Sequence, residues 1–199
     1  GYCKEQLWIE SEQGESNQVG DLIQIHLMLA RFAQPAKHYA VAERYLRGGI
    51  LPAQILETDS FLEETQNPAS DAGRCMKKRA IGGFGFPNPT CRLSAPHCEV
   101  NTVDITQGAA QGMCALTQQI MTKGEEGLRL NLFLSWDTPY GLVKSELPLE
   151  GSVTVQMKEG GLFSVRIPEN IQEGSLSIQV NGSPRTWQGF NGYAAIGAV

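Results

Sequence analysis

The first part of the chain carries apolar residues at helical spacing. From Asp21 onward, apolar positions recur at i, i+3 and i+4, which predicts a helix of about three turns. Its predicted apolar stripe consists of Leu22, Ile25, Met28, Leu29 and Phe32. Gln34-Pro35 ends this helix, and a second one fits residues 36–53 with Tyr39, Ala42, Leu46 and Ile50 on one face. Gly48-Gly49 and Pro52 weaken its last turns. Two helices joined by a short break predict a helical hairpin.

The next part of the chain contains a long region without a periodic pattern, followed by a third helical pattern. Residues 58–103 lack a sustained period and contain turn dipeptides such as Asn67-Pro68 and Gly82-Gly83, which predicts a long loop region. A third helix then fits residues 108–122, with Ala109, Met113, Leu116 and Ile120 on one side. The pattern up to residue 123 is therefore that of a helical part interrupted by a long loop.

After Gly124 the apolar period changes from 3.6 to 2, which predicts strands. Four alternating stretches fall within residues 128–135, 153–157, 163–167 and 176–180. Short strands at turn-separated intervals are typical of an antiparallel β-sandwich. Asn181-Gly182 predicts a type I′ hairpin, because that turn needs positive φ at both central residues. The alternative for Asn181-Gly182-Ser183 is an N-glycosylation sequon, which Pro184 disfavours.

This pattern predicts the α+β class, with a helical part over residues 1–123 and a β-sandwich over residues 124–199. The composition agrees with a globular protein, since 41% of the 199 residues are apolar and 19% are charged. No window approaches eighteen consecutive apolar residues, so we expect no membrane span. A net charge of -5 argues against a nucleic-acid partner, because binding to a phosphate backbone needs a basic face.

The two ends suggest a piece cut from a longer chain. Residue 1 is not a methionine, the first residues contain no apolar stretch of the kind that a secretory signal needs, and residues 192–199 end within an apolar run. We therefore expect the sandwich to be truncated, and we predict neither a compartment nor an oligomeric state.

The five cysteines and one helical histidine have simple interpretations. The cysteines are Cys3, Cys75, Cys91, Cys98 and Cys114. They form an odd set without a CxxC pair, which favours free, mostly buried thiols. The alternative, a zinc site from Cys91, His97 and Cys98, matches none of the closed tetrahedral spacings. His26 lies between apolar neighbours, which favours a packed, hydrogen-bonded histidine over a metal ligand.

Several stretches, taken in order, resemble one enzyme family. They are residues 15–23 (ESNQVGDLI), 42–47 (AERYLR), 82–88 (GGFGFPN), 104–113 (DITQGAAQGM), 128–134 (LRLNLFL), 151–155 (GSVTV), 164–169 (SVRIPE) and 180–182 (VNG). Together they resemble the β-L-arabinofuranosidase family, glycoside hydrolase family 127 and its relatives. The resemblance covers essentially the whole chain. It implies the last helical hairpins of an (α/α)6 barrel followed by an antiparallel β-sandwich.

The resemblance also implies a chemistry, namely retaining glycoside hydrolysis by a zinc-held cysteine nucleophile with a glutamate as acid. Glu15 matches the family's zinc-binding glutamate. Asn17, however, stands at the position of a ligand cysteine, and Asp104 and Ile105 stand at the adjacent nucleophile and ligand cysteines. An amide and an isoleucine cannot complete a thiolate-rich tetrahedron, so we expect no metal and no cofactor.

Carboxylates offer a replacement for the lost cysteine. We hypothesise that Asp104 acts as nucleophile or base, with Glu5 or Glu15 as the acid, because paired carboxylates are the ordinary equipment of glycosidases. Glu5 is a candidate acid because residues 1–5 (GYCKE) resemble a GWVGE motif that lies near the general acid in part of the family. The alternatives are that Asp104 caps the helix that begins near Gly108 and that Glu5 is a solvated glutamate.

Four further residues are candidates for contacts with a carbohydrate substrate. They are Asn17, His97, Phe84 and Trp8. Aromatic rings can stack on the apolar faces of sugars, although packing in the core is the alternative for both Phe84 and Trp8, and a surface role for His97. The expected function is that of a glycoside hydrolase-like protein acting on arabinofuranoside-type side chains or related sugars. The alternative is a catalytically inactive homologue that binds carbohydrate or serves as a structural module.

Overall fold

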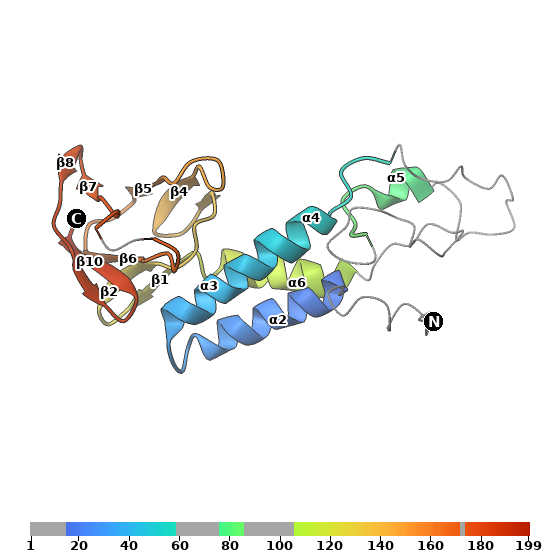
Figure 1. Ribbon diagram of the computed structural model, residues 1–199, viewed down its shortest axis with the longest axis horizontal. Helices are drawn as coiled ribbons and strands as arrows, with labels where there is room; N and C mark the ends of the chain where they lie inside the picture. The colour runs from blue at the N-terminus through green and yellow to red at the C-terminus, as the bar shows by residue number, and fades with distance from the viewer. Residues whose placement is uncertain (1–14, 59–75, 86–105, 172–173) are drawn as a thin grey trace, which may run out of the picture. The chain divides into compact units, whose positions relative to one another are not determined.

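The computed structural model describes residues 15–58, 76–85, 106–171 and 174–199 (Figure 1). These residues confirm the α+β class: substantial helices come first, followed by a five-stranded mixed sheet and smaller antiparallel sheets. They show neither a barrel nor a sandwich. The described residues divide into two compact units, the first from residues up to 22 and 44–113, the second from residues 23–43 and 114–199. The predicted division at residue 123 stays a prediction.

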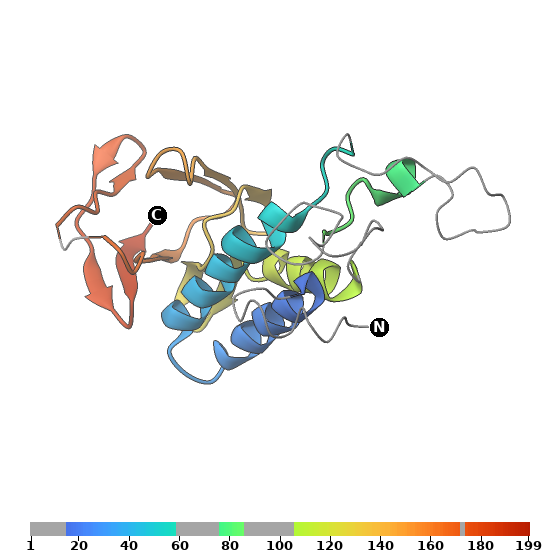
Figure 2. The ribbon, with the colours of Figure 1, turned by 45° about the vertical axis from the view of Figure 1, so that its right-hand side comes forward.

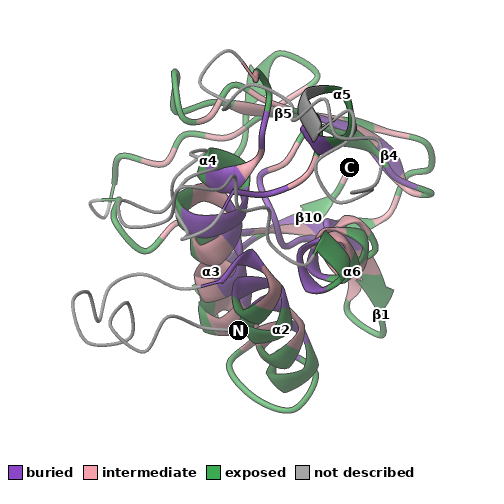
Figure 3. Cartoon of the chain, turned by 90° about the vertical axis from the view of Figure 1, so that its right-hand side faces the viewer, coloured by how far each residue is buried: buried purple, intermediate pink, exposed green. Residues whose placement is uncertain are grey.

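Helix α2, Ser16–Leu29, confirms the first predicted helix but buries a different side. The buried apolar positions are Val19, Ile23 and Leu27, and Ala30 directly after the helix, whereas Ile25 is 49% exposed and Met28 60% exposed. Figure 3 shows this helix with one buried and one exposed side. The prediction that this apolar stripe faces the core was therefore wrong. Apolar residues occur on both sides of this helix, so their period establishes the helix but cannot select the side that packs.

The second predicted helix forms over its whole length, as α3 (Pro35–Tyr45), a π-helical turn (Leu46–Ile50) and α4 (Leu51–Ala53). The π turn contains Gly48-Gly49, so the helix continues through the glycines by widening rather than by ending. Pro52 is the second residue of α4, which directly follows the π turn. The predicted buried face is confirmed at Tyr39, Ala42, Leu46 and Ile50.

The predicted helical hairpin is also confirmed, and the blue helices α2 and α3 run side by side in Figures 1 and 2. Within the second unit, His26 of α2 meets His38 of α3, with their Nδ1 atoms 3.0 Å apart. His26 is half-buried and hydrogen-bonded, as predicted. Burial, and then the nearby His38, lower the pKa of His26 below its ordinary value of 6.5.

The third helix and the predicted loop differ from expectation in their extents. Helix α6 covers Thr106–Thr117, and β1 (Met121–Gly124) begins where the predicted helix was still continuing. The predicted face is buried at Ala109, Leu116 and Ile120 and half-buried at Met113. Inside the predicted loop, a short helix α5 forms over Met76–Ala80, and Gln54 pairs with Phe84 in a β-bridge. Apart from residues 58 and 76–85, that loop lies outside the described residues.

The main sheet has the strand order β1-β2-β6-β10-β9. The further strands are β2 (Gly127–Leu130), β6 (Leu162–Arg166), β9 (Gln188–Phe190) and β10 (Tyr193–Ala198). Strands β2 and β6 pair in parallel and the other neighbours pair antiparallel, so a purely antiparallel arrangement was wrong for this pair. A parallel pair needs a crossover connection. The chain supplies one by inserting a second sheet of β3 (Trp136–Asp137), β4 (Gly141–Ser145) and β5 (Val153–Met157).

Two Asn-Gly turns shape the last part of the chain. Asn181 and Gly182 have φ of 50° and 78° and join β7 (Gln179–Val180) to β8 (Ser183–Pro184), which confirms the predicted hairpin. Asn191 and Gly192, with φ of 48° and 79°, join β9 to β10 in the same way. This second turn was not predicted, because the small residues of β10 show no alternation of large apolar side chains.

Candidate functional site

In the first unit, the beginning of α2 lies against the beginning of α6. The side-chain oxygen of Asn17 accepts a hydrogen bond of 3.0 Å from the backbone N–H of Gly108. Gly108 is the third residue of α6, so its N–H is one of the donors that a helix cannot satisfy internally. Asn17 therefore satisfies, from another segment, a donor that an N-cap side chain usually satisfies.

Glycines allow this close approach of the two backbones. A Cβ atom added to Gly20 would overlap the carbonyl oxygen of Gly108, and one added to Gly112 would lie 2.9 Å from the Cα of Gly20. Such contacts are shorter than real Cβ atoms tolerate, so larger residues would push the helices apart. The glycines in the first family-like stretch and in the fourth are thus required by one helix crossing.

Two of the predicted site residues, Glu15 and Asn17, lie at this crossing. Glu15 directly precedes α2 and is 8% exposed, next to Ser16 at 0% and close along the chain to Asn17. The segment that begins α6 follows Asp104 by two residues. Glu5, Trp8, His97 and Asp104 themselves lie outside the described residues, so the convergence of carboxylates stays a prediction.

Two of the predicted substrate contacts have structural roles here. Asn17 binds the α6 backbone, as described above. Phe84 is 1% exposed and lies in the core of the first unit, which agrees with the packing alternative for this ring. Cys114, by contrast, is exposed on α6, so the expectation of a buried thiol is wrong for it. The other four cysteines lie outside the described residues.

The residues at this helix crossing do not fit the family's zinc. Glu15 supplies a carboxylate, but the oxygen of Asn17 is engaged by the Gly108 N–H, and a neutral amide does not replace a thiolate ligand. Across the described ranges, no three His, Cys, Asp or Glu side chains are grouped so that they could hold a metal ion.

In the second unit, Glu43 of α3 and Arg166 of β6 form a buried ion pair, which the sequence analysis missed. Their side chains are 7% and 4% exposed. Arg166 also donates from Nε to the carbonyl of Asn131 at 2.5 Å, and its guanidinium lies 4.5 Å from the centre of the Phe133 ring. Desolvation lowers the pKa of Arg166, although Glu43 opposes this shift. The sequence signal that could have indicated this pair is that Glu43 and Arg166 each lie within a family-like stretch, AERYLR and SVRIPE.

Asn131 extends this polar cluster toward the sheet. Its side chain is fully buried, accepts a hydrogen bond of 2.8 Å from the Tyr193 hydroxyl and donates to the Gln119 carbonyl and the Thr122 hydroxyl. Burial raises the pKa of Tyr193 well above its ordinary value of 10. Among the residues that the structure describes, no buried side-chain nitrogen or oxygen lacks a partner, so this cluster is fully satisfied.

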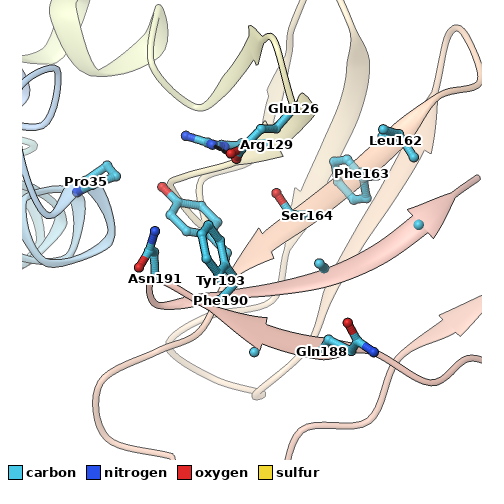
Figure 4. A pocket seen from close by; sticks show the side chains of 13 residues that line it. Pro35, Glu126, Arg129, Leu162, Phe163, Ser164, Gln188, Phe190, Asn191 and Tyr193 are labelled. Carbon is cyan, nitrogen blue, oxygen red and sulfur yellow. Dashed lines mark hydrogen bonds and ion pairs between the residues drawn. The ribbon is translucent and has the colours of Figure 1, made fainter.

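Beside this cluster, the five-stranded sheet carries a groove of about 490 Å³ (Figure 4). Its lining includes Glu126, Arg129, Ser164, Gln188 and Phe190. Arg129 forms an ion pair with Glu126 and lies 5.5 Å from the centre of the Tyr193 ring. None of these residues was a predicted site residue, because strands far apart in the chain bring them together.

No protein-family model matches the chain, and no curated protein or solved structure is significantly similar to it. Within the described part of the chain, every helix is too short or too polar to cross a lipid bilayer.

Proposed function

We propose that this chain belongs to a glycoside hydrolase-like protein that acts on carbohydrate and is related to the β-L-arabinofuranosidase family. The contact between Asn17 and the Gly108 N–H is the observation that carries this proposal. The resemblance required the stretch that begins at Glu15 and the stretch that begins at Asp104 to meet in one site. Residues of these two stretches, 91 positions apart in the chain, are in direct contact.

In the proposed mechanism, two carboxylates replace the zinc–cysteine centre. One of them, Glu15 or Glu5, donates a proton to the glycosidic oxygen as the bond to the leaving group breaks. Asp104 either attacks the anomeric carbon directly or removes a proton from the water that attacks it. Glu15 is 8% exposed, which fits a residue of an enclosed site better than one on the open surface.

The larger architecture is part of the same proposal. We infer that α2, α3 and α6 belong to the last helical hairpins of an (α/α)6 barrel and that the sheets belong to a β-sandwich. The order of helices before sheets supports this inference. The site would then lie where the helices of the first unit begin.

The test is hydrolysis of a panel of 4-nitrophenyl glycosides that includes both anomers of L-arabinofuranoside. We expect the full-length protein to release 4-nitrophenol from at least one of them, and Glu15→Gln in the same protein to lower the rate by about 100-fold or more. Glu57→Gln is the matched control, because Glu57 is an exposed glutamate of the same unit. Full activity in Glu15→Gln, or equal losses in both variants, would show that Glu15 is not the acid.

The second candidate is a homologue that binds carbohydrate without cleaving it. The backbone hydrogen bond of Asn17 favours this candidate, because Asn17 stands where the family has a zinc-binding cysteine and here it supports the α6 backbone instead. Saccharide binding without release of 4-nitrophenol from any glycoside of the panel would select this candidate. Release of 4-nitrophenol that depends on Glu15 would reject it.

A further inference from the structure

A row of paired residues crosses four strands of the main sheet. Arg129 of β2 pairs with Ser164 of β6, Ser164 pairs with Ala195 of β10, and Ala195 pairs with Gln188 of β9. Residues paired in this way point to the same face of a sheet. Small side chains therefore occupy the middle of the row and long ones its two ends, which makes this face concave. At the usual strand spacing the row is about 14 Å long.

An aromatic surface lies beside this row. Phe190 is two residues from Gln188 on β9, so both point to the same face, and 59% of Phe190 is exposed. Its partner across the β9–β10 ladder is Tyr193, which the polar cluster holds in place through Asn131. Figure 4 shows the two aromatic side chains close to each other at the groove. The groove thus offers the exposed ring of Phe190 beside Tyr193, which is buried and held by hydrogen bonding.

Polar groups of both kinds face the same space. The Arg129 guanidinium supplies N–H donors, and Glu126, its ion-pair partner, supplies carboxylate acceptors. Contact with the Tyr193 ring holds Arg129 further. Gln188 and Ser164 each add a group that can donate and accept. The charges of Arg129 and Glu126 cancel, so the groove combines many hydrogen-bonding atoms with no net charge.

We propose that this sheet groove is a binding site for a neutral oligosaccharide. Sugars present an apolar C–H face and a rim of hydroxyl groups that donate and accept, which matches an exposed ring beside planar polar side chains. Glu126 already neutralises Arg129 and would repel an anionic ligand. The site is distinct from the helix crossing of the first unit and rests on the proposed function only for the choice of saccharides as probes.

The test is titration of the chain with trisaccharides derived from arabinan, xylan and cellulose, and with an oligogalacturonate as the acidic counterpart. Binding is followed by ¹H–¹⁵N NMR of the Glu15→Gln variant. The measurement therefore does not depend on whether the protein hydrolyses glycosides. We expect one neutral trisaccharide to shift the backbone signals of Ser164, Gln188 and Ala195, with a dissociation constant of about 1 mM or lower.

Two variants assign that binding to the groove. Phe190→Ala should weaken it by about fivefold or more, because it removes the exposed ring. Phe32→Ala is the matched control, since Phe32 is 84% exposed and lies outside the groove. If Phe190→Ala lowers the melting temperature, Gln188→Ala serves instead, because that side chain is exposed.

Each outcome is decisive for this site. Signal shifts at the groove that are lost in Phe190→Ala or Gln188→Ala but kept in Phe32→Ala support the proposal. Absence of neutral saccharide binding, stronger binding of the oligogalacturonate, or binding whose shifts map to residues 15–22 and 106–113 would each overturn it.

Discussion

The buried ion pair between Glu43 and Arg166 should be the most sensitive point of the second unit. In Glu43→Gln the side chain keeps its shape but loses its charge. The Arg166 guanidinium, 4% exposed, then retains the Asn131 carbonyl, the Phe133 ring and the weaker attraction of Glu169, but it loses its buried ion-pair partner. Breaking a buried pair in this way costs about 3–5 kcal/mol, out of a total stability of about 5–15 kcal/mol for a typical protein. We expect the melting temperature to fall by about 6–20 °C.

The assay is thermal and urea unfolding of four proteins: wild type, Glu43→Gln, Arg166→Met and the double variant. Because either single change leaves a buried group without its ionic partner, the double variant should lose less than the sum of the two single losses. Glu159→Gln is the matched control, since Glu159 pairs with Lys123 at the surface and its loss should leave the melting temperature within experimental scatter. Equal effects of Glu43→Gln and Glu159→Gln, or strict additivity in the double variant, would refute the reasoning.

Two further predictions concern the helices. Gly20→Ala should destabilise the first unit by about 1–3 kcal/mol or more in urea unfolding, because the added Cβ would overlap Gly108. Gly48→Ala is the control and should be neutral or stabilising, because an added Cβ there meets nothing within 4 Å. Equal effects of the two changes would contradict the close helix crossing. The lowered pKa of His26 predicts that stability declines as pH falls through the ordinary value of 6.5, because the unfolded chain takes up a proton that the folded chain resists, and that the decline levels off below the folded pKa. Unfolding at about pH 7.5 and pH 5.5 should therefore show a smaller decline in His26→Gln than in wild type, and an unchanged decline would show that His26 does not titrate with a lowered pKa in the folded chain.

Local patterns predicted the elements well where one signal dominated. Residues 36–53 form a helix despite Gly48-Gly49, and Asn181-Gly182 makes its turn, because a buried face and a need for positive φ are both local properties. The alternation over residues 128–134 was less reliable. It correctly placed Leu128, Leu130 and Leu132 inside, but Asn131 and Phe133 are buried as well, since the strand ends at Leu130 and the chain then enters the core.

The candidate sites were predictable to different degrees. The resemblance selected Glu15 and Asn17 and implied that their stretch meets the one that begins at Asp104, and Asn17 does contact Gly108. The role of Asn17 as an acceptor for the α6 backbone was not visible, because it depends on a partner 91 residues away. The sheet groove could not be found from sequence at all, since its row of residues exists only through the pairing of β2, β6, β10 and β9.

Local sequence patterns were sufficient to predict the α+β class, the helical hairpin, the approximate positions of strands β2, β5, β6 and β7, and the Asn-Gly hairpin, because these follow from periodicity and from backbone preferences within a few residues. The tertiary structure alone decided which side of α2 is buried, the parallel pairing of β2 with β6, the ion pair between Glu43 and Arg166, and the groove. Each of these depends on which distant segments come into contact, and burial free energy is shared between both partners, so neither segment alone contains the answer.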